Sequence, residues 1–236
     1  MSDFMILLIC ATALLIIAIL LLRWLGKWCE SHQIADWGHA WLNRLDGFNR
    51  WFCRSFHGLQ VEPVPLPTDG GAIVVSNHIS GLDPLLLVAS CHRPLRFVIA
   101  EEQYNRWWLR WLFDSVGAIP VNRSSRPEKA FYAARKALDE GEIVAIFPEG
   151  GIPDADKPKV RLKRGATILA SLAQVPIFPL RLDGIRGKRL HLSAVLVPSK
   201  ARVSAAPSLT CDNETAKDCL HTITQFITDH IAEKRE

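Results

Sequence analysis

The chain has 236 residues, which is enough for one domain of ordinary size with a short appendage. Hydrophobic residues make up 49% of it and charged residues 22%, a balance that excludes wholesale disorder and predicts a sizeable core. The net charge of +4 is too small to indicate a nucleic-acid-binding protein by itself, and we expect no nucleic-acid partner.

The first predicted element is a long apolar helix. Residues 4–22 form 19 consecutive positions without a charge. A helix of that length spans about 28 Å, close to the ~30 Å hydrocarbon core of a bilayer. A cleaved signal peptide is the alternative, but no Lys or Arg precedes the run and no small-residue cleavage site follows it. We therefore expect residues 1–23 to form a retained, single-pass transmembrane anchor.

The charges that flank this run predict its orientation. Only Asp3 precedes it, whereas Arg23 and Lys27 follow it, so the positive-inside rule places the rest of the chain on the cytoplasmic face of the membrane. The six cysteines show no CxxC pair and no spacing typical of a disulfide framework or a zinc site. We expect free thiols in a reducing compartment and no bound metal.

Tryptophans gather in the next segment. Five of the eight lie between positions 24 and 51, and indole rings favour the headgroup layer of a membrane. We expect residues 24–58 to form amphipathic helices at the membrane interface, although packing against the following domain would explain the same pattern. A second basic and aromatic cluster, residues 106–113, is compatible with three roles: docking on lipid, guiding an acyl chain, or forming a core helix.

The remainder, residues 59–236, alternates apolar strands with helices. Asp83 and Pro84 have the pattern of an N-cap and a first helical position, and Gly141 is placed to end another helix. The alternation predicts an α/β fold, a mostly parallel sheet flanked by helices, with ligands at the carboxyl ends of the strands. The expected strands cover residues 71–76, 95–100, 117–121, 142–147, 175–182 and 190–197, and the expected helices cover residues 84–90, 106–113, 127–139, 163–174 and 214–232.

The first candidate for chemistry is the segment from Asn77 to Asp83, which follows a predicted strand. His78 can accept a proton near neutral pH, and a carboxylate on its other ring nitrogen would fix its tautomer. A turn containing Ser80 and Gly81 would allow Asp83 to reach back to His78. The alternative is that Asp83 only caps a helix and His78 is an ordinary loop residue.

Two further groups follow other strands. Glu149 and Gly150 lie in the sequence FPEGG, where glycines leave backbone N–H groups open to a ligand, although a tight turn explains the pattern equally. Arg123 follows the strand at residues 117–121, and Lys163 and Arg164 begin a helix at the end of a basic segment. These cations would suit a phosphate, a solvated basic loop or attraction to anionic headgroups.

Taken in order, these blocks resemble the membrane-bound glycerolipid acyltransferases, typified by 1-acylglycerol-3-phosphate acyltransferase. The family carries NHxxxxD, a short strand ending in Arg, FPEG followed by Thr or Ser, and a VP-apolar strand, and a Lys-Gly-Ala element follows the third block. The matching residues here are Asn77, His78, Asp83, Ile119 to Arg123, residues 147–150, Lys163 to Ala166, and Val175, Pro176 and Ile177.

The resemblance implies a glycerol-3-phosphate-acyltransferase-like fold, with residues 59–236 as the acyltransferase domain and no cofactor. It implies O-acyl transfer from acyl-CoA or acyl carrier protein to a lysophospholipid among the membrane lipids, with 1-acyl-sn-glycerol-3-phosphate giving phosphatidic acid. His78 would be the general base and Asp83 would orient it. The remaining roles would be a phosphate site at Arg123 and Lys163 with Arg164 in reserve, a glycerol contact at Glu149 beside Gly150, and oxyanion N–H groups near Val175, Pro176 and Ile177.

Gly151 departs from the family pattern, because Thr or Ser is usual at that position. The departure keeps other acceptors open, namely another lysophospholipid, glycerol 3-phosphate or an amino-acid lysolipid. Two remoter alternatives are a non-catalytic lipid-binding protein at the membrane surface and a metal-dependent hydrolase that uses His78, Asp83 and His92. An esterase of the α/β-hydrolase type is unsupported because the sequence contains no GxSxG.

Overall fold

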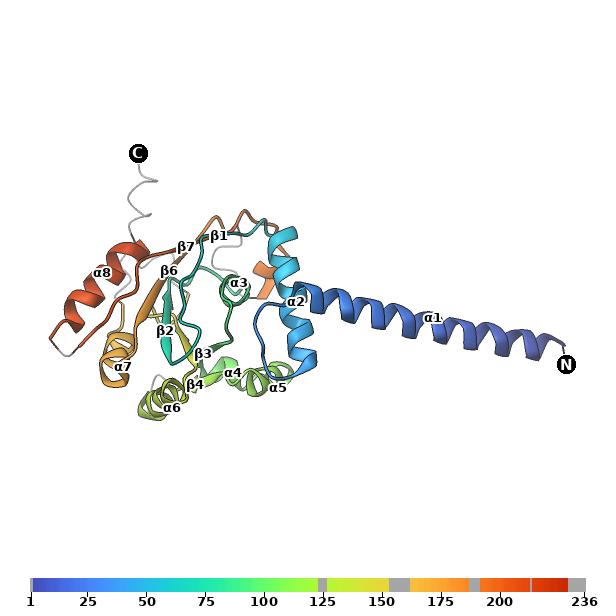
Figure 1. Cartoon of the computed structure of the whole chain (residues 1–236), viewed down its shortest axis with the longest axis horizontal. Coiled ribbons are helices and arrows are strands. Elements are labelled where there is room, and N and C mark those ends of the chain that lie inside the picture. The colour runs from blue at the N-terminus through green and yellow to red at the C-terminus, as the bar shows by residue number, and fades with distance from the viewer. Residues whose placement is uncertain (1, 123–126, 153–161, 187–191, 213, 229–236) are drawn as a thin grey trace.

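The computed structural model describes residues 2–122, 127–152, 162–186, 192–212 and 214–228, and within them one seven-stranded sheet forms the centre of the fold (Figure 1). The strand order is β1-β7-β6-β2-β5-β3-β4, and every pairing is parallel except that of β6 with β7. The predicted α/β class with a mostly parallel sheet is confirmed. The strands are β1 (Gln60–Val61), β2 (Ala72–Ser76), β3 (Leu95–Ala100), β4 (Ile119–Val121), β5 (Ile143–Ile146), β6 (Ile177–Asp183) and β7 (Arg202–Ala205).

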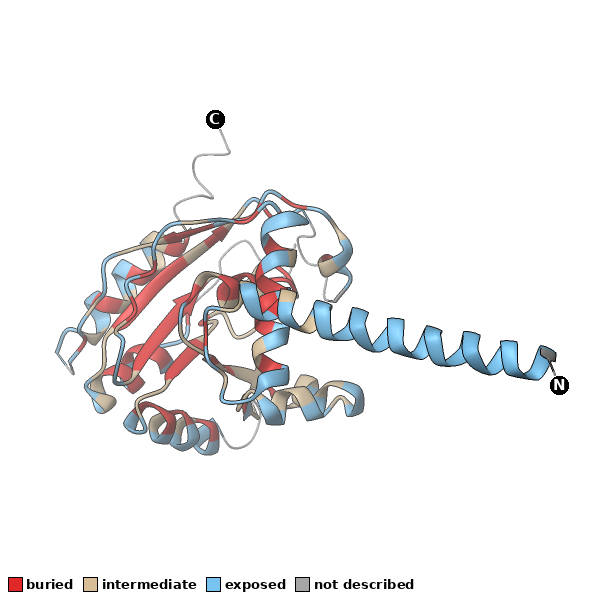
Figure 2. Cartoon of the chain, turned by 45° about the vertical axis from the view of Figure 1, so that its right-hand side comes forward, coloured by how far each residue is buried: buried red, intermediate tan, exposed pale blue. Residues whose placement is uncertain are grey.

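Helices cover both faces of the sheet, and the alternation of side chains along β2 shows how. Ala72 and Val74 belong to the core cluster that includes residues of α2 (Ala40–Ser55) and α3 (Asp83–Ser90). Ile73 and Val75 belong to the cluster on the opposite face, with α6 (Pro127–Asp139), α7 (Gly165–Ala173) and α8 (Ala216–Thr228). A strand buried on both faces reads as a continuous apolar run, and the buried central strands are visible in Figure 2.

The expected strand at residues 190–197 is wrong. Its described part is a short 3₁₀ helix, η1 (Leu192–Leu196), and the strand that follows is β7, which pairs antiparallel with β6. Ala194 of η1 is fully buried in the core beside α3. A short apolar run has the same composition whether it is a strand or a buried helical turn, so periodicity could not separate the two.

The aromatic segment at residues 106–113 is mostly helical, as expected, and a second short helix precedes it. These are α4 (Glu101–Tyr104) and α5 (Trp107–Ser115). None of the residues of α5 is buried, so the interpretation of this segment as a core helix is wrong.

Two helices precede the sheet, and we call them the N-terminal helix pair. Helix α1 (Ser2–His32) continues without a break beyond the expected boundary at residue 23 and projects from the domain, and α2 lies crosswise at its base (Figure 1). The two helices approach so closely at Gly47 that an added Cβ would fall 1.7 Å from the carbonyl oxygen of Cys29. Among the described residues, α1 is the one helix long and apolar enough to cross a membrane, and its most apolar window is wholly exposed (Figure 2).

The cysteines differ from expectation at one place. Cys211 and Cys219 are joined by a disulfide that ties the start of α8 to the segment before it, across a Cα–Cα distance of 6.2 Å. The expectation of six free thiols is therefore wrong for this pair, whereas Cys10, Cys29, Cys53 and Cys91 are free. Cysteine usage consequently gives weaker support to a reducing compartment than the spacing alone suggested.

Candidate active site

The structure brings His78 and Asp83 together across the turn that follows β2. The distance between Nδ1 of His78 and Oδ2 of Asp83 is 2.7 Å. The imidazole stacks on the ring of Phe147 with centroids 4.2 Å apart, and its side chain is 17% exposed. Because the carboxylate of Asp83 accepts a hydrogen bond from Nδ1–H, the tautomer is fixed and Nε2 is left to accept a proton from a ligand.

Asp83 is fully buried, and its carboxylate is held by the turn that it closes. It accepts hydrogen bonds from the backbone N–H groups of Ile79 and Ser80 and from the hydroxyl of Ser80. Asp83 is the first residue of α3, and Leu82 occupies the N-cap position, so the predicted N-cap role of Asp83 is wrong. Its hydrogen bonds run to the preceding loop and to His78, which orients the imidazole.

Glu149 lies beside this pair because β5 is the neighbour of β2. One carboxylate oxygen of Glu149 accepts the backbone N–H of His78 at 3.2 Å. Burial raises the pKa of Glu149 to about 7, the hydrogen bond from His78 opposes that rise, and the charge of Asp83 adds to it. Glu149 is therefore close to half protonated near neutral pH.

Lys163 lies over the glycine turn after Glu149. Gly150 has a φ of +75°, and a Cβ added there would fall 2.6 Å from Nζ of Lys163. The backbone N–H of Lys163 donates to the carbonyl of Pro148, which holds the two loops together. The positive φ favours glycine at position 150, and the side chain of Lys163 would have to move to admit a larger residue there.

The other predicted site residues are not gathered here. Val175, Pro176 and Ile177 lie at the start of β6, where Ile177 pairs with Ile73 at the amino end of β2, away from His78. The N–H of Val175 donates to Ala170, that of Ile177 donates to Leu209, and proline has none. These residues therefore cannot supply the expected oxyanion N–H groups.

The remaining cations divide into two cases. Arg164 is exposed at the N-cap of α7 and does not line the cavity described below. Arg123 lies outside the described residues, as do Lys157, Lys159 and Arg161 of the basic segment. The predicted role of Arg123 stays a prediction.

A cavity of about 1450 Å³ opens beside His78. Phe147, Gly150, Gly151 and Lys163 line it together with His78. The rest of the lining is mostly apolar, and α2 and α5 form two of its walls. Their lining residues are Leu42, Leu45, Phe48 and Phe52 on α2 and Leu109, Leu112 and Phe113 on α5.

Two supports of the site escaped sequence reasoning. The first is the role of Asn77, a motif residue to which the sequence assigned no contact: its side-chain amide donates to the carbonyl of Leu182 at 2.9 Å, and its side-chain oxygen accepts a hydrogen bond from the N–H of Leu182 at 2.7 Å. This double hydrogen bond fixes the end of β2 to β6 directly before His78. An asparagine that immediately follows a buried strand was the available signal.

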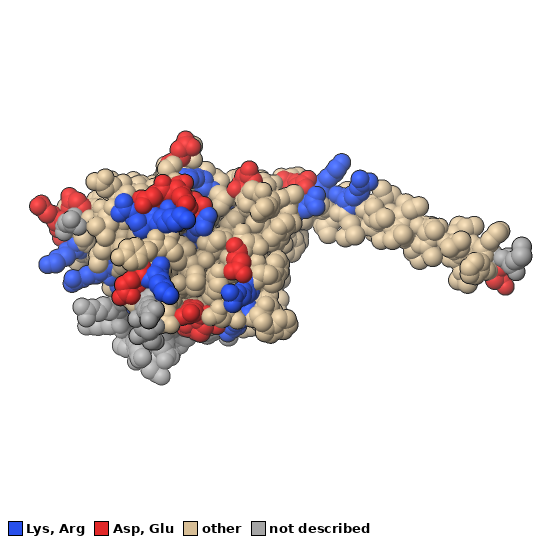
Figure 3. Space-filling model, turned by 90° about the horizontal axis from the view of Figure 1, so that it is seen from below, with Lys and Arg blue, Asp and Glu red and all other residues tan. Residues whose placement is uncertain are grey.

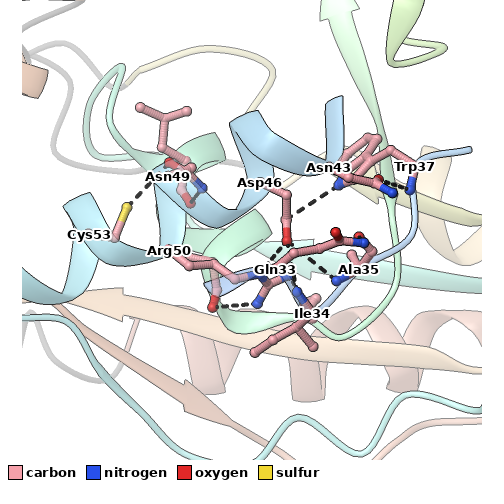
Figure 4. A network of polar contacts seen from close by, with 12 residues as sticks. Gln33, Ile34, Ala35, Trp37, Asn43, Asp46, Asn49, Arg50 and Cys53 are labelled. Atoms are coloured by element: carbon pink, nitrogen blue, oxygen red, sulfur yellow. Dashed lines mark hydrogen bonds and ion pairs between the residues drawn. The ribbon is translucent and has the colours of Figure 1, made fainter. Parts of the chain in front are cut away.

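The second support is a buried ion pair that joins the N-terminal helix pair to α3 (Figure 4). Arg50 is 2.7 Å from Asp46, and its guanidinium donates to the carbonyls of Ala89 and Cys91 at the end of α3. Asp46 in turn accepts the N–H groups of Ile34 and Ala35, in the link between α1 and α2. The helix that begins with Asp83 is therefore bound at its other end to the segment that continues from α1.

Comparison with known proteins identifies a family and a fold. The family model Acyltransferase matches residues 57–183, just over half of the chain. The 1-acyl-sn-glycerol-3-phosphate acyltransferase of Bacillus subtilis is 29% identical over 157 residues, which cover 59% of this chain and 77% of that protein. The protein of the same name from Borreliella burgdorferi is 27% identical over 119 residues, which cover 50% and 47% respectively.

A solved structure shares the fold. The 1-acyl-sn-glycerophosphate (LPA) acyltransferase PlsC from Thermotoga maritima superposes with a TM-score of 0.62 at 19% identity, covering 85% of this chain and 83% of that one. The chain belongs to the Acyltransferase family. It is an acyltransferase enzyme, and its helix α1 is long and apolar enough to associate with a membrane.

Proposed function

We propose that this acyltransferase transfers an acyl group from an acyl thioester, on coenzyme A or acyl carrier protein, to the free hydroxyl of 1-acyl-sn-glycerol-3-phosphate. The observation that carries the proposal is the His78–Asp83 pair, whose imidazole lines a large and mostly apolar cavity. The donor and the acceptor both bring a long acyl chain, and an apolar cavity next to a general base suits such substrates. The names of the Bacillus and Thermotoga relatives favour this acceptor.

In the proposed reaction, Nε2 of His78 accepts the proton of the acceptor hydroxyl while its oxygen attacks the thioester carbonyl carbon. Asp83 holds Nδ1 and stabilises the imidazolium that forms, because its buried carboxylate keeps its charge close to the ring. The tetrahedral intermediate then collapses, the carbon–sulfur bond breaks, and the imidazolium returns the proton to the leaving thiolate. The chain's own residues supply this chemistry, and we propose that no cofactor or metal takes part.

The acceptor phosphate is proposed to bind at Lys163, over the Gly150 turn. Lys163 lines the cavity, and α7 begins two residues later, so the lysine and the amino end of the helix both contribute positive charge. Glu149 would contact the glycerol portion. Its raised pKa favours this position, because a protonated carboxyl does not repel a phosphate nearby. Arg123 remains a proposed second phosphate ligand.

We also propose that α1 spans the membrane once and that the domain lies on the cytoplasmic face. The basic flank at Arg23 and Lys27 supports this orientation. A site held beside the bilayer suits an acceptor and a product that both reside there.

A panel assay tests the acceptor. Purified enzyme would receive acyl-CoA and acyl carrier protein thioesters with lysophosphatidic acid (1-acylglycerol 3-phosphate), its phosphate-free analogue monoacylglycerol, glycerol 3-phosphate and other lysolipids. We expect turnover with lysophosphatidic acid, and we expect Lys163→Met to weaken its apparent affinity, seen as a higher KM, without affecting monoacylglycerol. Lys136→Met is the matched control, because Lys136 is an exposed residue of α6, and this variant should alter the KM for neither acceptor. Turnover with a different lysolipid alone would reject this acceptor and retain the acyl transfer.

A further inference from the structure

Helix α5 is apolar on both sides, although none of its residues is buried. Leu109, Leu112 and Phe113 face the cavity. Trp107, Trp108 and Trp111 are exposed by 88%, 42% and 56%. Three tryptophans side by side in water would be an unusually costly surface for a soluble domain. The inner face is explained by the cavity, whereas nothing among the described residues covers the outer face.

The position of α5 points to what covers it. The ring of Trp111 lies 5.7 Å from the ring of Trp41 on α2, so the outer face of α5 continues the exposed face of α2. On α2, Leu45, Phe48 and Trp51 are also exposed. Figure 1 places α5 below the lower end of α2, on the side of the domain from which α1 projects.

The direction of α1 fixes where a bilayer would lie. If α1 crosses the membrane, α2, which lies crosswise at its base, runs along the membrane surface (Figure 1). The outer face of α5 then reaches the same surface. Seen from below, uncharged atoms cover much of the surface beside the base of α1, while basic and acidic side chains stand at that base and further charged groups lie across the rest of the domain (Figure 3).

We propose that Trp107, Trp108 and Trp111 form a second membrane-docking surface, which rests in the headgroup layer of the bilayer that α1 enters. Indole rings favour this layer. Contact at α1 and at α5 holds the domain at two points and fixes its tilt. The wall of the cavity formed by α5 then faces lipid. Resting on the proposed function, this gives an acyl chain a route between bilayer and cavity that avoids water.

The direct test measures depth in the membrane and does not depend on activity. In a Cys10→Ser background the remaining free cysteines are buried and the other two are bonded, so a single added cysteine can be labelled with an environment-sensitive fluorophore. The label would be placed at Trp107→Cys, and at Tyr132→Cys on α6 as a matched control, since Tyr132 is 73% exposed. The full chain is then reconstituted into anionic phospholipid vesicles with lipids that carry a quencher near the headgroup.

We expect the label at position 107 to shift to the blue and to be quenched, and the label at position 132 to do neither. Equal, weak quenching at both positions would overturn the proposal, even if the enzyme were fully active. As a second measurement, Trp107→Ser/Trp111→Ser should raise the KM for a long-chain acceptor in vesicles several-fold while leaving that for a short-chain, water-soluble acceptor unchanged. Tyr132→Ser should change neither, and an equal loss with both acceptors would contradict docking at this surface.

Discussion

At the scale of single residues, the site depends on Asp83, which holds His78 and closes the turn before α3. Asp83→Asn would retain the size of the side chain but remove the charge that stabilises the imidazolium and selects the tautomer. We expect kcat to fall by about 10²–10⁴-fold with little change in KM. Steady-state kinetics measure this, and a kcat within a factor of about three of wild type would contradict the role of Asp83.

Glu149 makes the stability of the folded protein depend on pH. Its pKa is about 7 in the folded protein and near 4.5 when unfolded, so the folded state binds the extra proton between these values. Stability therefore falls as pH rises from about 4.5 to 7, by up to about 3 kcal/mol. We expect Glu149→Gln to remove this loss and to unfold at a higher temperature than wild type at pH 8.

Thermal unfolding of both proteins between pH 5 and 8 measures the difference. The gap between variant and wild type should widen as pH rises, because the wild-type carboxyl loses its proton in this range. Parallel curves for the two proteins would show that Glu149 has an ordinary pKa.

Residues of the site differ in how far the sequence predicted them. His78 and Asp83 were predicted to meet because the turn between them contains glycine, and the contact at 2.7 Å confirms that geometry. The oxyanion assignment to Val175, Pro176 and Ile177 failed because a motif marks position along the chain and not which end of a strand faces the site. The contacts of Asn77, and the residues Arg50 and Asp46 altogether, were missed because their partners are backbone groups distant in sequence.

At the scale of elements, alternation identified the central strands and flanking helices, since buried parallel strands read as apolar runs between helical patterns. It failed at η1, where a short apolar run is ambiguous. The orientation of α2 across α1 could not be predicted, because it depends on the close contact between Gly47 and the backbone of Cys29.

The buried ion pair of Asp46 and Arg50 is the main polar contact between the N-terminal helix pair and α3. Arg50→Met would leave the Asp46 carboxylate buried without its countercharge. We expect a loss of about 3–5 kcal/mol of unfolding free energy, measured by denaturation in detergent. Arg44→Met is the control on the same helix, because its ion pair with Glu30 is exposed and should contribute under about 1 kcal/mol. Equal losses of stability in the two variants would contradict this role of the buried ion pair.

At the scale of the whole molecule, α1 and the sheet domain form one unit whose cavity lies next to the proposed membrane surface. The proposed orientation predicts that protease cleaves the domain in inverted inner-membrane vesicles and spares it in right-side-out vesicles. An immunoblot against a C-terminal tag reads the outcome. Cleavage in right-side-out vesicles alone would reverse the orientation, and the Cys211–Cys219 disulfide would then fit the oxidising compartment.

Acyl transfer by the His78–Asp83 pair underlies every other part of the proposed function, and one assay tests it. Wild-type enzyme and His78→Ala are given radiolabelled acyl-CoA and lysophosphatidic acid, and labelled phosphatidic acid is measured over time. We expect the variant to unfold at the wild-type temperature and to lose at least about 10²-fold in rate, because no other group replaces the base. Acyl transfer at the wild-type rate by folded His78→Ala would contradict this role of the pair.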